Sequence, residues 1–109
     1  MKKLILIFLL IGLTAAFALA DQFFIENGTG SYSFIFVYVS DSRSDEWGTS
    51  LLGVNVLRPG QRMQVTTTIP VGNTTWNIMV VDEDNDTYTF WRRTVRSNEV
   101  VRVTLDDLD

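Results

Sequence analysis

The sequence contains no cysteine and no histidine. Without histidine, zinc sites of the usual type, Ser-His-Asp triads and histidine acid–base catalysis are excluded. Without cysteine, thiol nucleophiles, iron–sulfur ligation and disulfide bonds are excluded as well. Carboxylates, hydroxyls, tyrosines and arginines are the side chains left for chemistry. The composition therefore favours either carboxylate chemistry or binding.

The sequence also contains only two lysines, Lys2 and Lys3. They precede an apolar run at residues 4–13. Small residues at Ala18 and Ala20 then have the spacing that signal peptidase reads. We expect residues 1–20 to be a signal peptide cleaved before Asp21, which places the mature protein in the periplasm or outside the cell. The alternative is an uncleaved anchor, but residues 4–20 are at the short limit of a membrane span, so we expect no stable membrane insertion after cleavage.

Residues 21–109 are enough for one small domain and too few for two. They carry 7 arginines against 13 acidic residues, which leaves a formal charge of −6. An acidic domain does not wrap phosphate backbones, so nucleic acid is excluded as a partner. Because no disulfide can form, the domain has to be held by apolar burial, and a bound metal ion would add to its stability.

Short runs of aromatic and β-branched residues alternate with turn signals along the whole domain. This spacing predicts an all-β fold, a small antiparallel β-sandwich of about seven strands, Ig-like or C2-like, with a closed small β-barrel as the alternative. The predicted strands are 22–27, 31–40, 51–57, 61–69, two within the hairpin 76–93, and 100–105.

The strand at residues 31–40 is apolar on both faces, which predicts a central strand covered on both sides. We expect its aromatic row to pack in the core, and an exposed platform for ligand stacking is the alternative. The aromatic row consists of Tyr32, Phe34, Phe36 and Tyr38, and the opposite row of Ile35, Val37 and Val39.

Three aspartates at alternate positions, Asp82, Asp84 and Asp86, lie in the connection of the predicted hairpin. They match the first half of an EF-hand calcium loop, but Thr87 replaces the required glycine and Arg93 the required glutamate, so an EF-hand is excluded. Such closely spaced polar residues favour a solvated tight turn that keeps the hairpin soluble. Binding of Ca²⁺ by these carboxylates is the alternative.

The segment 41–50 has no strand period and is long for a loop in so small a domain, which favours a functional role. Its acidic residues Asp41, Asp45 and Glu46 would join the calcium site if both acidic segments emerge at the same end of the sandwich. Trp47 and Arg43 are the residues of this loop that we expect to contact a protein or glycan partner. Trp76 and Trp91 would stack on sugars only if exposed, and Trp76 is expected in the core.

The chain contains several short motifs in a characteristic order. Because it shares these motifs, it resembles a group of uncharacterised small exported bacterial β-proteins. The hairpin turn departs from the group's pattern, since Asn85 stands where glycine is usual, and the cysteine pair of some relatives is missing. The resemblance implies a compact exported β-domain and no established activity. The motifs are Tyr-Val-Ser at 38–40, Ser-Asp-Glu-Trp-Gly at 44–48, Leu-Leu-Gly at 51–53, Pro-Gly at 59–60, Val-Asp-Glu-Asp-Asn-Asp-Thr-Tyr at 81–88 and Thr-Leu-Asp-Asp-Leu at 104–108.

Two functions follow from these observations. The first is a secreted or periplasmic, non-enzymatic binding or structural module stabilised by Ca²⁺ through its acidic loops. The second is a small carboxylate-dependent hydrolase of the glycosidase kind, which would use two of its acidic residues as acid and base. A domain of this size has little depth for a substrate cleft, so we expect no enzyme. The candidate acid–base residues are Asp45, Glu46, Asp82 and Asp84.

Overall fold

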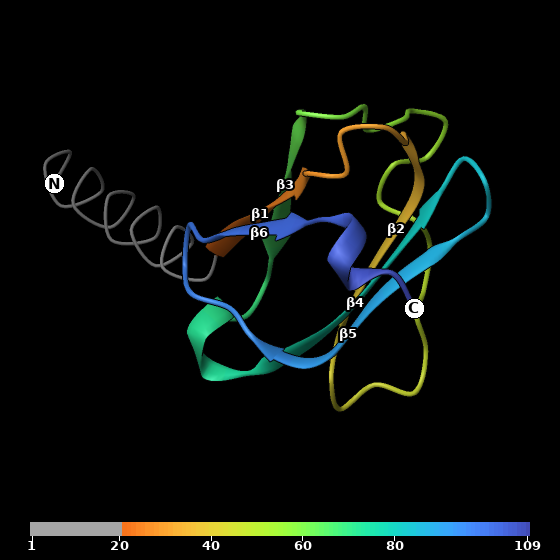
Figure 1. The fold of residues 1–109 in the computed structure, drawn as a ribbon. Coiled ribbons are helices and arrows are strands. Elements are labelled where there is room, and N and C mark those ends of the chain that lie inside the picture. The colour runs from red at the N-terminus through yellow and green to blue at the C-terminus, as the bar shows by residue number, and fades with distance from the viewer. Residues whose placement is uncertain (1–20) are drawn as a thin grey trace, which may run out of the picture.

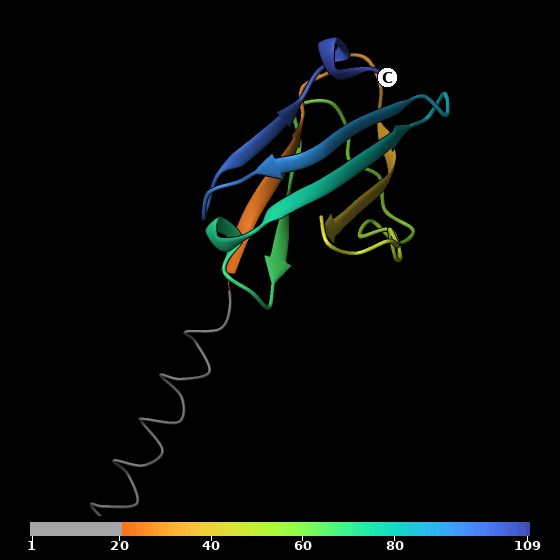
Figure 2. The same cartoon turned by 90° about the horizontal axis from the view of Figure 1, so that it is seen from below.

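A computed structural model of the protein describes residues 21–109 (Figure 1). The predicted signal peptide, residues 1–20, lies outside the described residues. Two sheets of three strands pack face to face, so the predicted β-sandwich is confirmed, and no barrel closes within residues 21–109 (Figure 2). No helix in the described part of the chain is long and apolar enough to cross a bilayer.

The first sheet, sheet A, has the strand order β3-β1-β6. Its strands are β1 (Asp21–Asn27), β3 (Arg62–Thr67) and β6 (Val100–Val103). The second sheet, sheet B, has the order β2-β4-β5 and contains β2 (Phe34–Asp41), β4 (Thr75–Asp82) and β5 (Thr87–Thr94). Two single turns of 3₁₀ helix, η1 (Val71–Asn73) and η2 (Leu105–Asp107), complete the elements.

Alternation of apolar and polar residues decides which face of each strand is buried. In β1, Phe23 and Ile25 are buried, while the alternate residues Gln22, Phe24 and Glu26 are only partly covered. β1 pairs antiparallel with β3 and parallel with β6, so sheet A is not purely antiparallel. Because β1 is central and β6 is the last strand, the two ends of the domain are joined within one sheet.

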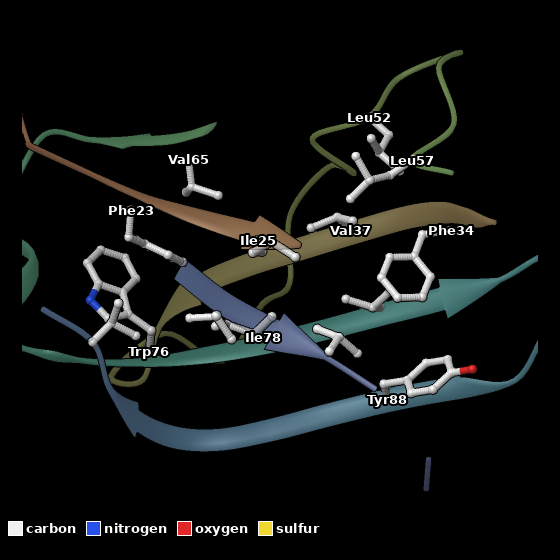
Figure 3. Close-up of a cluster of buried hydrophobic side chains, with 14 of the residues drawn as sticks. Phe23, Ile25, Phe34, Val37, Leu52, Leu57, Val65, Trp76, Ile78 and Tyr88 are labelled. Carbon is white, nitrogen blue, oxygen red and sulfur yellow. The ribbon is translucent and has the colours of Figure 1, made fainter. Parts of the chain in front are cut away.

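The core lies between the sheets and draws side chains from both (Figure 3). Phe23 on β1 packs against Trp76 on β4 with ring centroids 6.0 Å apart, and Phe34 on β2 packs against Tyr88 on β5 at 5.6 Å. The prediction that Trp76 is a core residue is therefore confirmed. Full burial of each such side chain is worth about 1.5–3 kcal/mol.

Two strand predictions are wrong. Residues 51–57 form turns rather than a seventh strand, because Gly53 adopts a positive φ of 59° and only Leu57 bridges to β2. The strand predicted at 31–40 is not central, since β2 is an edge of sheet B. A bulge between Phe34 and Phe36 shifts the alternation by one residue, so Val37 points into the core and Phe36 points outward.

β2 and β4 run antiparallel, with Phe34 opposite Asp82 and Asp41 opposite Trp76. The loop that follows β2 and the turn that follows β4 therefore leave sheet B at opposite ends. Figure 1 shows this separation, with the loop after β2 in yellow and the hairpin turn in cyan. The condition under which the two acidic segments would share a calcium site, emergence at one end of the sandwich, is therefore not met.

Candidate functional site

The acidic hairpin turn is organised by Asp82, whose side chain is fully buried. Its Oδ1 accepts the backbone N–H groups of Asp84 at 2.9 Å and Asp86 at 3.1 Å. Its Oδ2 accepts the hydroxyl of Tyr88 at 2.8 Å, and burial together with this hydrogen bond raises the pKa of Tyr88. Both oxygens of this carboxylate are thus occupied by the turn itself.

Asn85 supplies the backbone conformation that the turn requires, with a φ of 64°. Its N–H donates to the carbonyl of Asp82 at 2.9 Å, and the left-handed region that it adopts is more accessible to asparagine than to most residues. Asp84 and Asp86 themselves are exposed. This is the tight-turn role that the sequence favoured over a metal site.

The other acidic segment consists of Asp41, the last residue of β2, and residues 42–50, which we call the 42–50 loop. At its start, Asp41 pairs with Arg43, whose Nη2 lies 2.5 Å from the Asp41 Oδ2. The side-chain hydrogen bonds from Arg43 lower the pKa of Asp41 to about 2. Arg43 nevertheless stays 76% exposed in its side chain, so it can contact a partner only by giving up or sharing this pair.

The six predicted metal ligands do not form one site. Asp82, Asp84 and Asp86 lie at one end of sheet B, and the residues of the other segment lie at the opposite end. Within residues 21–109 there is no group of three or more carboxylates close enough to hold a metal ion. Bound Ca²⁺ therefore stays a prediction that depends on the sequence pattern alone. The other segment contributes Asp41, Asp45 and Glu46.

Four aromatic rings lie in mutual contact on the outer face of sheet B, and we call them the aromatic strip. Phe36 and Tyr38 on β2 stack with centroids 6.1 Å apart. Trp47 from the 42–50 loop lies 6.4 Å from Tyr38 and 5.5 Å from Trp91 on β5. Trp91 is 67% exposed and Phe36 39% exposed. Trp47 thus bridges rings that two different strands present to solvent.

Beside Trp47 and Trp91 lies a cavity of about 330 Å³, which we call the strip cavity. Apart from the two tryptophans, every residue that lines it is polar or charged. Its floor includes Asn77 on the central strand β4, which is only 8% exposed. The polar residues are Ser40, Ser42, Ser44, Asp45, Glu46, Asn77 and Arg92.

A larger cavity of about 710 Å³ opens between the edge of β2 and the edge of β3. Its apolar lining includes Val39, Met63 and Ile69, which pack against the core from its margin. This cavity is the incompletely covered side of the sandwich, and the two charged residues that line it, Asp41 and Arg43, already pair with each other.

The structure places the predicted contact residue Trp47 at the middle of the aromatic strip. Phe36 and Tyr38 were expected in the core, and Asn77 was not considered. Trp91 could have been recognised from the sequence, because Thr89 and Trp91 alternate with the inward-facing Tyr88 and Phe90. The bulge that turns Phe36 outward leaves no comparable signal in the sequence.

Searches of protein-family models, of curated proteins and of solved structures find no match to this chain.

Proposed function

We propose that this chain is a secreted or periplasmic, non-enzymatic binding module whose ligand face is the outer face of sheet B. The observation that carries the proposal is the aromatic strip, in which Trp91 is 67% exposed. Exposed apolar patches are costly in water, and tryptophan and tyrosine are enriched where proteins bind ligands. The predicted signal peptide at residues 1–20 supports the location.

The aromatic strip also has a fixed geometry, which favours binding. Each ring touches the next at a centroid distance between 5.5 and 6.4 Å, so the strip is held together before any ligand arrives. Side chains that are ordered in advance lose little conformational entropy when a ligand binds. The strip therefore provides a preorganised apolar surface with polar groups along one side.

The hydrolase alternative is less well supported by the arrangement of the carboxylates. A glycosidase needs two carboxyl groups that face each other across the substrate. Asp82 uses both oxygens inside its own turn, and the hairpin turn lies at the opposite end of sheet B from Asp45 and Glu46. The two carboxylates that remain in the strip cavity are adjacent in sequence. Binding without catalysis is the function we favour.

A titration of ¹⁵N-labelled protein followed by NMR tests this function. Soluble polysaccharides form one set of probes, and a panel of purified extracellular proteins forms the other. We expect at least one probe to shift the indole N–H signals of Trp47 and Trp91 and to leave that of the buried Trp76 in place. Trp91→Ala should weaken this binding about tenfold or more.

Val54→Ala is the matched control, because Val54 is fully exposed and lies outside the strip and its cavity. Its binding should equal that of the unchanged protein. Binding that survives Trp91→Ala undiminished, or shifts confined to residues of sheet A, would contradict the assignment of the ligand face.

A further inference from the structure

We infer that the ligand is a neutral glycan, one sugar unit of which enters the strip cavity and packs against Trp47 and Trp91. The inference rests on the proposed function and specifies the class of ligand. It follows from three properties of the cavity, namely unpaired donors on its floor and walls, two inclined aromatic walls, and acidic groups at its rim.

The first property is an unpaired donor at Asn77. The Oδ1 of this side chain accepts the backbone N–H of Arg92 at 2.9 Å, which fixes the orientation of the amide. Its Nδ2 donates no hydrogen bond within residues 21–109, although the residue is only 8% exposed. This nitrogen is open to solvent, because Arg93 Nε is the only buried side-chain nitrogen or oxygen without a partner in residues 21–109, so a ligand in the strip cavity can supply an acceptor for it.

The walls add two further donors. The indole N–H of the core residue Trp76 donates to the carbonyl of Val71 at 3.2 Å, whereas those of Trp47 and Trp91 have no partner in the described part of the chain. Both tryptophans line the cavity, so their indole N–H groups are available to a ligand beside them. The hydroxyl and ether oxygens of a sugar are acceptors distributed around a ring, as this arrangement requires.

The second property is the shape of the aromatic walls. The rings of Trp47 and Trp91 are 5.5 Å apart and inclined by 48°, and both rings line the cavity. The negative face of an indole attracts the partly positive C–H groups on the face of a pyranose ring. A sugar unit combines such an apolar face with a polar edge, as the cavity combines tryptophans with polar residues.

The third property is charge. Asp45 and Glu46 line the cavity and can accept hydrogen bonds from hydroxyl groups. Their charges, in a domain with a formal charge of −6, repel an anionic glycan. An aliphatic peptide side chain would leave the free donors and these carboxylates unpaired on burial. A quaternary ammonium group fits the rings and the two carboxylates, but it offers no acceptor for the free donors.

The test uses the purified protein with defined probes in tryptophan fluorescence and calorimetric titrations. Cellohexaose, xylohexaose, mannohexaose and laminarihexaose are the neutral probes. Hexagalacturonate is the anionic probe, choline chloride the cationic probe, and a panel of extracellular proteins the polypeptide probe. We expect at least one neutral hexasaccharide to bind, and the anionic one to bind at least about tenfold more weakly than it.

Three variants locate the sugar. Trp47→Ala and Trp91→Ala should each weaken glycan binding about tenfold or more. Asn77→Asp keeps the size of the side chain and the acceptor for Arg92 but removes the free donor, and it should weaken binding of the neutral glycan several-fold. Val54→Ala should change nothing. Circular dichroism and thermal unfolding of each variant confirm that the fold is retained.

Each other outcome overturns a defined part of the inference. Neutral-glycan binding that Trp47→Ala and Asn77→Asp leave unchanged overturns the cavity as its site. Trp91-dependent binding of a protein or of choline, with no binding of a neutral glycan, overturns the glycan and leaves the proposed function standing. If no probe binds in a manner that depends on Trp91, the inference and the proposed function both fail.

Discussion

The two acidic segments of this molecule have similar compositions, but their carboxylates lie in different environments. In the hairpin turn, the carboxylate of Asp82 is buried and both of its oxygens accept hydrogen bonds from the turn. In the 42–50 loop, Asp45 and Glu46 are exposed and line the strip cavity. A cluster of carboxylates thus becomes available for a ligand only where the backbone does not already occupy its oxygens.

The difference arises from the position of each segment in sheet B. The hairpin turn joins two neighbouring strands in a few residues, so its N–H groups converge and need a local acceptor. The 42–50 loop leaves an edge strand and crosses the outer face, where its side chains meet Trp91 on β5. The following predictions test this contrast, beginning with the largest expected effect.

Replacement of Asp82 should destabilise the domain most. Asp82→Ala leaves two backbone N–H groups and the Tyr88 hydroxyl without their acceptor, which we expect to cost about 2–4 kcal/mol in the free energy of unfolding. Urea unfolding measures this loss. The control Asp84→Ala removes an exposed carboxylate from the same turn, and its stability should stay within about 0.5 kcal/mol of the unchanged protein. Equal losses of unfolding free energy in the two variants would show that the burial of Asp82 does not make it more important for stability than Asp84.

A smaller effect should come from the backbone of the same turn. Asn85 has a φ of 64°, so Asn85→Ala is expected to cost about 1 kcal/mol because alanine disfavours this region. Asn85→Gly should retain the stability of the turn, since glycine adopts positive φ readily. Thermal unfolding of both variants checks the pair. If Asn85→Gly loses as much stability as Asn85→Ala, the contribution of Asn85 comes from its side chain rather than from its positive φ.

The start of the 42–50 loop should respond to acid. Asp41 has a pKa of about 2 in the folded protein, below its ordinary value of 3.8. Its contribution is therefore present above about pH 4 and is lost as the pH falls toward 2. Asp41→Asn should flatten this part of the stability profile, as measured by urea unfolding between pH 2 and 5. A weaker dependence of stability on pH should remain in Asp41→Asn, because the pKa of Asp21 is also lowered, chiefly by the hydroxyl of Ser97.

Arg43→Gln is the matched control for the acid profile, because it removes the partner and retains the carboxylate. It should flatten the profile nearly as much as Asp41→Asn, since the hydrogen bonds from Arg43 are the largest cause of the shift. An unchanged profile in Arg43→Gln would assign the acid response of the loop to the other groups around Asp41.

The smallest effect is expected from calcium. A ligand that binds only the folded state raises its stability, so a calcium site in the hairpin turn would raise the unfolding midpoint. Because both oxygens of the buried Asp82 already accept hydrogen bonds, we expect CaCl₂ to raise the midpoint only slightly above its value with chelator. If calcium raises the midpoint substantially and Asp84→Asn abolishes this rise, the hairpin turn does bind calcium. The carboxylates of the hairpin turn would then be available to a ligand, contrary to the contrast drawn above.

Much of the fold was predictable from local patterns. The hairpin, its tight turn at Asn85 and the core position of Trp76 all follow from residues that are near one another in sequence. The strand predicted at 51–57 fails because Gly53 and its neighbours favour successive turns over an extended chain, a balance that apolar content does not reveal.

The site was harder to predict, because it depends on pairings between distant residues. A bulge of one residue in β2 exchanges the two faces of the strand and exposes Phe36, and the sequence carries no marker for it. The antiparallel pairing of β2 and β4 decides which loops share an end of the sandwich. The polar loop around Trp47 was recognisable, whereas its contacts with Tyr38 and Trp91 were not.

The parallel pairing of β1 with β6 constrains the order in which the domain can assemble. Ile25 lies opposite Val101, so the middle strand of sheet A gains its second neighbour only when nearly the whole chain is present. Contacts between residues so distant in sequence form slowly. Sheet A would thus be completed late in folding, because β1 cannot gain its second neighbour before β6 is available.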